Sequence, residues 1–368
     1  MRQRRPRAPP HDRWEWRLIR PRVCIYIPVD ASGASHRRLR EAGCEVVLGQ
    51  ATWRTGIELD ALFGLARGAH ALMGATIKRA PIDGDFLDRL PELRIVSKYT
   101  IGVEDVDLDA ATARGVLVTH CPTEANWGGV AEGTVGFMLT LLKRVRERDR
   151  HVKAGEWRDS SLMGTYLGRR EDGYPGLTIG IVGLGRCGSR VAELLSTWRV
   201  RMLACDPYVE DDKFERLGVV RADLPTLLGE SDVVTLHVTL TEETRGLIGA
   251  RELAAMKPSA ILINTSRGAV VDLDALCDAL NTDRIAAAAL DVLPEEPPGE
   301  QARVLTLGDK VLLCPHMISA NHPGTLQPAI PWATDATLAA LRGQVPERVC
   351  NADAVPRWLA RFGNRSLI

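Results

Sequence analysis

The sequence has no excess of either charge, because its 368 residues include 47 Lys plus Arg and 47 Asp plus Glu. A chain balanced in this way has no overall field that would draw it to nucleic acid or to an acidic membrane, and we expect neither partner. No apolar run approaches the roughly 18 residues of a membrane-spanning helix. The composition, 45% hydrophobic and 26% charged, is typical of a globular chain with room for two domains.

Cysteine is present but lacks the spacing of a functional cluster. The eight cysteines form no Cys-x-x-Cys pair and no zinc-like pattern with histidine, so we expect no metal site. Several lie within apolar runs, where cysteine packs as a small hydrophobe. This distribution favours a reducing compartment and predicts a cytoplasmic protein. Cys187, in a glycine-rich loop, is interpreted as a small spacer in preference to a redox group.

Residues 1–22 depart from this balance, since they contain eight arginines and four prolines but only Asp12 and Glu15 as acids. The composition predicts a disordered basic tail. The tail lacks the roughly 7–15-residue apolar core of a secretory signal and the serines of a transit peptide. We favour a solvated arm or an over-long start, and a nucleic-acid-binding arm is the alternative.

The most informative segment is residues 178–206, TIGIVGLGRCGSRVAELLSTWRVRMLACD. Gly183, Gly185 and Gly188 have G-x-G-x-x-G spacing after an apolar run and before a helical stretch. Gly183 allows a tight turn, and Gly185 allows the backbone to approach a pyrophosphate closely. Gly188 allows the helix to pack closely on the strand. Asp206 lies about 20 residues on, where a carboxylate binds the adenosine ribose. A purely structural turn is the alternative, but this context favours a dinucleotide site.

The residues around Asp206 also predict which dinucleotide binds. Asp206 is followed by Pro207 and Tyr208, with no arginine beside it to receive a 2′-phosphate. A carboxylate at this position would repel that phosphate. We therefore predict NAD as the cofactor in preference to NADP.

Short apolar runs alternate with helical segments from residue 23 onward, which predicts βαβ units and parallel sheets. The first series has strands at 23–27, 71–73, 95–97 and 116–119, and helices at 35–42, capped by Ser35, and 107–113. The second series has six strands, at 178–182, 201–205, 233–237, 260–264, 286–290 and 311–314. Residues 131–154 are predicted to form one long helix, and residues 325–342 a helix that returns to the first domain.

Three polar segments follow late strands of the second series, at 264–268, 291–297 and 314–316. Ligands of open α/β sheets bind beyond the carboxyl ends of the strands. An arginine, a carboxylate and a histidine placed there can bind and reduce a 2-oxo acid. Each residue alone has a simpler interpretation: a solvated arginine, a structural histidine or an exposed glutamate.

Several further motifs occur in an order that resembles the NAD-dependent D-2-hydroxyacid dehydrogenase family, over residues 23–358. Besides GLGRCGSRVA at the glycine loop, the matching segments are LHVTLTEETRGLI (236–248), INTSRGAVVD (263–272), ALDVLPEEP (289–297), LCPHMIS (313–319) and DVDLDAATARGVLVTHCPTEANWGGVAE (105–132). The resemblance implies hydride transfer between the nicotinamide and C2 of a D-2-hydroxy acid. The fold class predicted is α/β, with two Rossmann-like or flavodoxin-like parallel-sheet domains and an interdomain cleft.

The resemblance also implies a division of the chain and the roles of particular residues. The expected domains are the basic tail 1–22, a substrate domain at 23–122 plus 320–368, and an NAD-binding domain at 123–319. Arg267 would bind the substrate carboxylate, His316 would be the acid and base, and Glu296 would pair with His316. The cofactor-binding residues would be Gly183, Gly185, Arg186, Cys187, Gly188, Asp206, His237, Thr239, Thr244, Thr265 and Asp291. A homodimer, formed through the helical region after Asn126, is a family expectation.

The substrate loop departs from the family pattern, which often reads Gly-x-Gly-x-Asp. Here Thr100, Ile101 and Gly102 are followed by Val103 and Glu104. Because threonine does not readily adopt a positive φ, we expect a reshaped loop that still binds substrate. Lys98 stands where a basic residue would meet a second anionic group of a phosphorylated or dicarboxylic substrate; a surface lysine is the alternative.

Phosphoglycerate dehydrogenase and glyoxylate/hydroxypyruvate reductase are the main candidates within the family. Only 18 residues follow Cys350, so we expect no appended regulatory domain. Formate dehydrogenases have Gln where this chain has Glu296, which disfavours formate as the substrate. Ile101 stands where a lysine would be expected for phosphite oxidation, which disfavours phosphite. An NAD-sensing protein like the family's transcriptional corepressors is the alternative from a different functional class.

Overall fold

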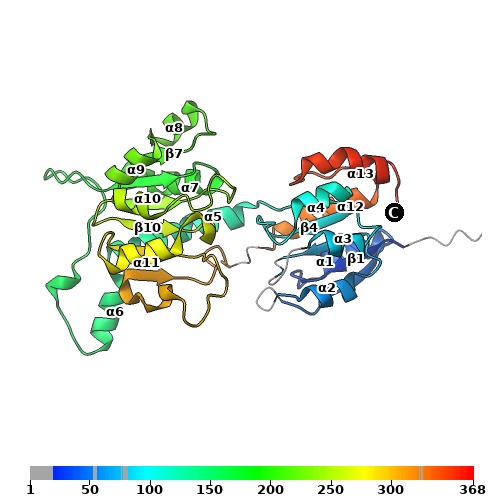
Figure 1. Cartoon of the computed structure of the whole chain (residues 1–368), viewed down its shortest axis with the longest axis horizontal. Coiled ribbons are helices and arrows are strands. Elements are labelled where there is room, and N and C mark those ends of the chain that lie inside the picture. The colour runs from blue at the N-terminus through cyan, green and yellow to red at the C-terminus, as the bar shows by residue number, and fades with distance from the viewer. Residues whose placement is uncertain (1–19, 53–55, 76, 78–81, 323, 325) are drawn as a thin grey trace, which may run out of the picture. The chain divides into compact units, whose positions relative to one another are not determined.

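The computed structural model describes residues 20–52, 56–75, 77, 82–322, 324 and 326–368. They form two compact units (Figure 1). Unit 1 contains the described residues up to Pro122 together with Leu326–Ile368, and unit 2 lies within Thr123–Thr325. Most of the predicted basic tail, residues 1–19, lies outside the described residues, so the prediction of disorder there stays a prediction.

Unit 1 is built on a five-stranded sheet whose strands pair in parallel in the order β2-β1-β3-β4-β5. The strands are β1 (Arg22–Ile25), β2 (Glu45–Leu48), β3 (Ala71–Gly74), β4 (Ile95–Lys98) and β5 (Leu117–Thr119). The helices are α1 (Ala34–Glu41), α2 (Leu59–Ala66), α3 (Gly84–Asp88), α4 (Leu108–Arg114), α12 (Ala329–Leu341) and α13 (Val355–Phe362). One apolar cluster joins the sheet to α1, α12 and α13, and another joins it to α2, α3 and α4.

Two predictions for unit 1 need correction. The short strand β2 was missed, because its sequence, EVVL, is only four residues long and is only partly buried. Ser35 does not cap α1: the residue before the helix is Gly33, with φ 66°. The Ser35 hydroxyl instead donates to the carboxylate of Asp30 at 2.6 Å, so this serine stabilises the turn that leads into the helix.

Unit 2 is built on a seven-stranded sheet, again paired in parallel, in the order β12-β11-β10-β9-β6-β7-β8. The strands are β6 (Thr178–Val182), β7 (Arg201–Cys205), β8 (Val220–Arg221), β9 (Val233–Leu236), β10 (Ile261–Asn264), β11 (Ala287–Leu290) and β12 (Val311–Leu313). The helices are α5 (Glu124–Leu142), α6 (Val145–Lys153), α7 (Arg186–Leu195), α8 (Asp211–Leu217), α9 (Leu224–Glu230), α10 (Ala250–Ala255) and α11 (Leu273–Asn281). The chain winds outward in both directions from β6, so the sheet has its switch point between β6 and β9, where ligands of such sheets bind.

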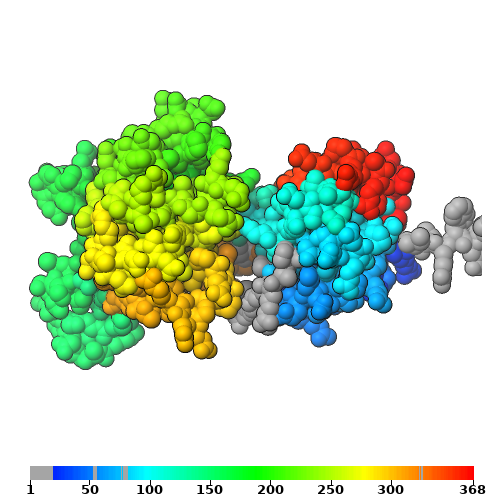
Figure 2. Space-filling view, viewed as in Figure 1, coloured from blue at the N-terminus to red at the C-terminus, as the bar shows by residue number. Residues whose placement is uncertain are grey.

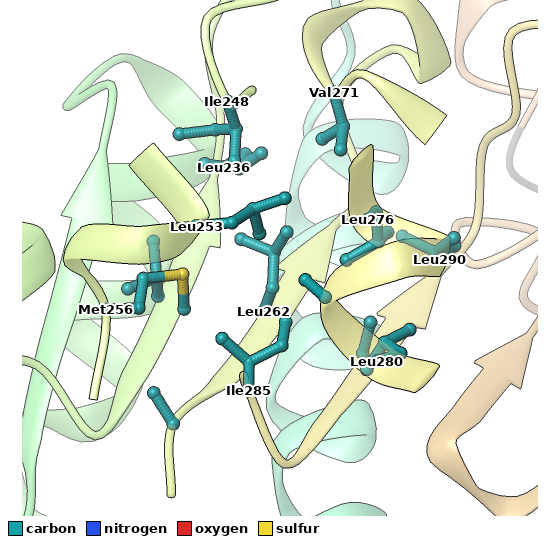
Figure 3. Close-up of a cluster of buried hydrophobic side chains, with 14 of the residues drawn as sticks. Leu236, Ile248, Leu253, Met256, Leu262, Val271, Leu276, Leu280, Ile285 and Leu290 are labelled. Atoms are coloured by element: carbon teal, nitrogen blue, oxygen red, sulfur yellow. The ribbon is translucent and has the colours of Figure 1, made fainter. Parts of the chain in front are cut away.

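Both faces of this sheet are buried. On one face α9, α10 and α11 pack against the strands. Figure 3 shows Leu253 of α10, Met256 directly after that helix, and Leu276 and Leu280 of α11 gathered around Leu262 of β10. On the other face α5, α7 and α8 form a second apolar cluster with the sheet. Burial on both faces explains why the strands are continuous apolar runs.

The predicted single helix over 131–154 is wrong. Arg144 has a left-handed backbone, with φ 52° and ψ 42°, and it separates α5 from α6. Local helix propensity does not reveal this break. Short 3-10 turns occur at Ser160–Leu162, Ser196–Trp198, Gly268–Val270, Arg303–Thr306, Gly308–Lys310 and Ala352–Ala354. Within the described residues, no helix combines the length and apolar character needed to cross a membrane.

Candidate active site

The glycine loop joins β6 to α7, and the N-terminal end of α7 is left open. Gly183 has φ +91°, and a Cβ on Gly188 would lie only 2.0 Å from the carbonyl oxygen of Gly183. Glycine is therefore required at both positions for the helix to begin so close to the strand. A Cβ on Gly185, the residue before α7, would meet nothing within 4 Å. The exposed N–H groups of the helix end, with Arg186 and Cys187 in its first turn, suit a pyrophosphate.

Asp206 follows β7 and is held beside the glycine loop. Its Oδ2 accepts a hydrogen bond from the backbone N–H of Leu184 at 2.8 Å, and its Oδ1 accepts one from Tyr208 at 3.0 Å. A carboxylate has further acceptor sites beyond these two. The fixed carboxylate beside an open helix end fits the adenosine and pyrophosphate parts of a dinucleotide.

A third segment, after β9, contacts the same loop from the other side. A Cβ on Gly183 would lie 2.8 Å from the carbonyl of His237. The His237 ring bonds through Nε2 to the Thr235 hydroxyl at 3.0 Å, while its buried Nδ1 has no partner among the described residues. Burial lowers the pKa of His237 to about 4. The neutral ring thus offers one unused polar atom beside the cofactor loop.

Thr239 and Thr244 form a compact turn after this strand. The Thr244 hydroxyl donates to the carbonyl of Thr239 at 2.6 Å and accepts from the backbone N–H of Thr241 at 2.8 Å. Thr265, predicted with them, lies after β10, where its hydroxyl is 3.0 Å from that of Thr134 in α5.

Arg267 lies just after β10 in a turn that Asn264 organises. The Asn264 amide donates to the carbonyl of Arg267 at 2.9 Å, and its Oδ1 accepts from the Ser266 N–H at 3.0 Å. The next residue, Gly268, packs directly on the segment after β11, since a Cβ there would lie 2.0 Å from the carbonyl carbon of Leu293. The fold therefore brings the Arg267 turn against the loop that contains Glu296.

Glu296 and His316 form a hydrogen-bonded ion pair, with 2.7 Å between Oε2 and Nδ1. The other oxygen of Glu296 accepts from the backbone N–H of Leu293 at 3.0 Å. The hydrogen bond to Glu296 raises the pKa of His316 despite partial burial, and Arg267 opposes the increase. Burial alone would raise the pKa of Glu296, but its bonds to His316 and Leu293 and the charge of Arg267 lower it. The side chains of His316 and Glu296 remain 49% and 38% exposed, respectively, so both are accessible to a ligand.

Asp291 holds the turn that contains His316. Its buried Oδ1 accepts from the backbone N–H groups of Met317 and Ile318 at 2.9 and 3.1 Å, and its carbonyl accepts from the His316 N–H at 2.7 Å. His316 itself has φ 54°, a left-handed conformation that is uncommon outside glycine. Such strained backbone is often found where a side chain must point in one particular direction.

Comparisons with known proteins show the family of this chain. Residues 135–317 match the D-isomer specific 2-hydroxyacid dehydrogenase, NAD binding domain. The chain is 40% identical over 279 residues to a glyoxylate reductase of Korarchaeum cryptofilum, an alignment that covers 75% of this chain and 81% of that protein. The chain belongs to the D-isomer specific 2-hydroxyacid dehydrogenase family. It is an NAD-dependent oxidoreductase of 2-hydroxy and 2-oxo acids.

Further members resemble this dehydrogenase along most of its length. It is 36% identical over 314 residues to the D-3-phosphoglycerate dehydrogenase of Archaeoglobus fulgidus, covering 85% of this chain but only 56% of that protein. The crystal structure of the Aquifex aeolicus D-lactate dehydrogenase, complexed with NAD and lactic acid, superposes with a TM-score of 0.76 at 26% identity and covers 90% of this chain and 99% of the other. The predicted family and the predicted α/β class, with two parallel-sheet domains, are therefore confirmed.

The predicted substrate loop of this dehydrogenase lies in unit 1, after β4. Thr100 does not have a positive φ, in line with the expectation for threonine, and the reshaping of the loop stays a prediction. Its hydroxyl donates to the carbonyl of Gly102 at 2.8 Å, and its own carbonyl accepts from the Cys121 N–H at 3.0 Å. The carbonyl of Ile101 lies 3.1 Å from Nδ1 of His120. Threonine is accommodated here in ordinary backbone geometry.

Lys98 is fully buried, so the alternative of a surface lysine is wrong. Its ammonium contacts the carboxylate of Asp105, the carbonyl of Ala75 and the Tyr26 hydroxyl, the last at 3.3 Å. Burial lowers the pKa of Lys98, and Asp105 opposes that shift. Because its donors are directed to protein groups, the structure lends no support to a second anionic group of the substrate at this position.

Sequence reasoning missed Arg221. No arginine adjoins Asp206 along the chain, but β8 pairs with β7 and places Ala204 opposite Arg221. The Arg221 guanidinium donates to the carbonyl oxygen of Asp206 at 3.1 Å. A two-residue strand has too little pattern to predict this pairing.

Proposed function

We propose that Arg267, Glu296 and His316 catalyse the reversible reduction of a 2-oxo acid to a D-2-hydroxy acid. The observation that carries this proposal is the 2.7 Å hydrogen bond between Glu296 and Nδ1 of His316. Since Glu296 occupies Nδ1, the proton exchanged with the substrate oxygen is the one on Nε2. Arg267 binds the substrate carboxylate and polarises its carbonyl, because the planar guanidinium can make paired hydrogen bonds.

The protein groups move the proton and stabilise the charge of the reaction. NAD(H), when bound, accepts or supplies the hydride at C2 of the substrate. Protonated His316 is the general acid for reduction, and the neutral ring is the general base for oxidation. Glu296 favours the imidazolium, and the positive charges of His316 and Arg267 face the oxygen on which negative charge develops.

We assign cofactor binding to unit 2. Gly183, Gly185 and Gly188, with Arg186 and Cys187, would hold the pyrophosphate, and Asp206 would bind the adenosine ribose. The further cofactor contacts proposed are His237, Thr239, Thr244, Thr265 and Asp291. The open helix end, the fixed carboxylate and the unused Nδ1 of His237 support this set. The carboxylate favours NAD over NADP.

We assign substrate binding to residues 98–102 of unit 1. Thr100, Ile101 and Gly102 would offer backbone groups to the substrate carboxylate. Lys98 would support this loop from within the core through Asp105. The division proposed is therefore a substrate domain at 23–122 plus 320–368 and an NAD-binding domain at 123–319.

Among substrates, we propose glyoxylate or hydroxypyruvate first. The similarity to the Korarchaeum glyoxylate reductase, which extends over 81% of that protein, supports this choice. The phosphoglycerate dehydrogenase relative is matched over only 56% of its length, and buried Lys98 offers no contact for a phosphate.

The deciding experiment is NADH oxidation with glyoxylate, hydroxypyruvate, phosphohydroxypyruvate and 2-oxoglutarate. We expect turnover with the first two, and a loss of about 100-fold or more in His316→Ala with NADH affinity little changed. Near-normal turnover in that variant would contradict the acid–base assignment. Tight NADH binding without turnover of any 2-oxo acid would favour the NAD-sensing alternative.

We also propose a homodimer in the cytoplasm. Large apolar side chains are exposed on α6 and the segment after it, and Figure 2 shows this part of unit 2 as protrusions at its left edge. Exposed there are Val145, Val152, Trp157, Met163 and Tyr166. Such a group of exposed apolar residues favours a protein partner. The eight cysteines are all free thiols, which agrees with a reducing compartment.

A further inference from the structure

Arg221 is held against the backbone of Asp206, the residue whose carboxylate is proposed to select NAD. Its guanidinium donates to the carbonyl of Asp206 at 3.1 Å, forms an ion pair with Asp211 and lies 4.7 Å from the ring centroid of Phe214. The three partners lie directly after β7, at the start of α8 and within α8. The cation is thus positioned by the fold next to the end of β7.

The Asp206 carboxylate is also fixed, but by different groups. Backbone N–H groups of Leu184 and Tyr208 each bond one of its oxygens. A 2′-phosphate on the adenosine ribose would therefore meet a carboxylate that cannot turn away and a guanidinium close to the same residue. The carboxylate repels the phosphate, whereas the guanidinium attracts it and can bind it through two parallel hydrogen bonds.

The present partner of Arg221 does not prevent such a role. Arg221 and Asp211 have side chains 42% and 79% exposed. Ion pairs as exposed as this contribute little to stability and are easily exchanged for another anion. Arg221 can therefore exchange Asp211 for another anion while Phe214 still supports its planar group.

We propose that Arg221 is a latent receiver for the 2′-phosphate of NADP, and that the charge of Asp206 is what keeps this dehydrogenase selective for NAD. The inference rests on the proposed preference for NAD.

The test compares Asp206→Asn, Arg221→Met and the double variant, and measures dissociation constants by fluorescence titration. The probes are NADH, NADPH and the matched pair 2′,5′-ADP and 5′-ADP. Asp206→Asn should shift the NADPH-to-NADH affinity ratio toward NADPH by roughly 10–100-fold, the range expected for charge-assisted hydrogen bonds. Adding Arg221→Met should remove most of that gain. Arg201→Met is the matched control, since Arg201 is an exposed arginine at the other end of β7, paired with Glu230, and it should leave the ratio unchanged.

The inference is overturned when the double variant keeps the full gain for NADPH. A wild-type chain that already binds NADPH more tightly than NADH would contradict the proposed NAD preference instead. In that case, loss of NADPH affinity in Arg221→Met would support Arg221 as the receiver of the 2′-phosphate, and unchanged affinity would reject this role. If Asp206→Asn does not fold, 2′,5′-ADP is titrated into the wild type and into Arg221→Met. Equal affinities of the two proteins for 2′,5′-ADP reject the inference.

Discussion

His316 combines a left-handed backbone with a carboxylate partner on its ring. Neither feature can be recognised from the residues around it, Pro315 and Met317. The turn is held by Asp291, which lies 25 positions earlier in the chain and accepts two of its N–H groups. Asp291 was predicted for its contact with the cofactor, and its bonds to the turn are an additional structural role.

The Glu296–His316 bond predicts a pH dependence. In the proposed mechanism, reduction requires protonated His316, whose pKa is raised by Glu296. In the wild type, activity in the reduction direction should persist above the usual histidine pKa and fall as pH rises through the raised value. Glu296→Gln lowers that pKa, so the falling limb should move to lower pH in profiles of kcat/KM.

Glu295→Gln is the matched control, because Glu295 is an exposed glutamate in the same loop. It should leave the falling limb in place. A profile of Glu296→Gln that coincides with the wild type would show that the carboxylate does not set the histidine pKa.

At the scale of elements, the strand–loop–helix unit of β6 and α7 predicts different outcomes for two glycines. Gly188→Ala places a Cβ against backbone at 2.0 Å and should destabilise unit 2. Gly185→Ala meets no protein atom within 4 Å, so it should fold normally yet bind NADH more weakly, because the methyl group lies where the pyrophosphate approaches. Thermal unfolding and NADH titration separate the two effects. Normal NADH affinity in Gly185→Ala would contradict the proposed pyrophosphate site.

Elements were predictable where their pattern is local. The strands at 178–182 and 201–205 agree with the observed bounds, and the other four predicted strands of unit 2 agree within one residue. They are apolar because both faces of a parallel sheet are covered. The break at Arg144 and the strand β8 were missed, because a single left-handed residue and a two-residue strand leave no periodic signal.

At the scale of the whole molecule, the exposed apolar segment after α6 predicts self-association. Trp157 and Met163 are 72% and 73% exposed. Replacing both with lysine should convert dimers to monomers in analytical ultracentrifugation, because charge disfavours burial in an interface. Leu305→Lys is the control, because Leu305 is also an exposed apolar residue of unit 2. It should leave the dimer intact. A wild-type chain that sediments as a monomer would contradict the homodimer.

The sequence by itself determined the α/β class, the dinucleotide loop and the candidates Arg267, Glu296 and His316, because glycine spacing, apolar runs and motif order are properties of neighbours along the chain. Only the tertiary structure decided that Lys98 is buried against Asp105 and that Arg221 lies beside Asp206. Both depend on the pairing of segments and on burial, which bring together charges that are separate in sequence. The proposed preference for NAD therefore has to be tested at both Asp206 and Arg221.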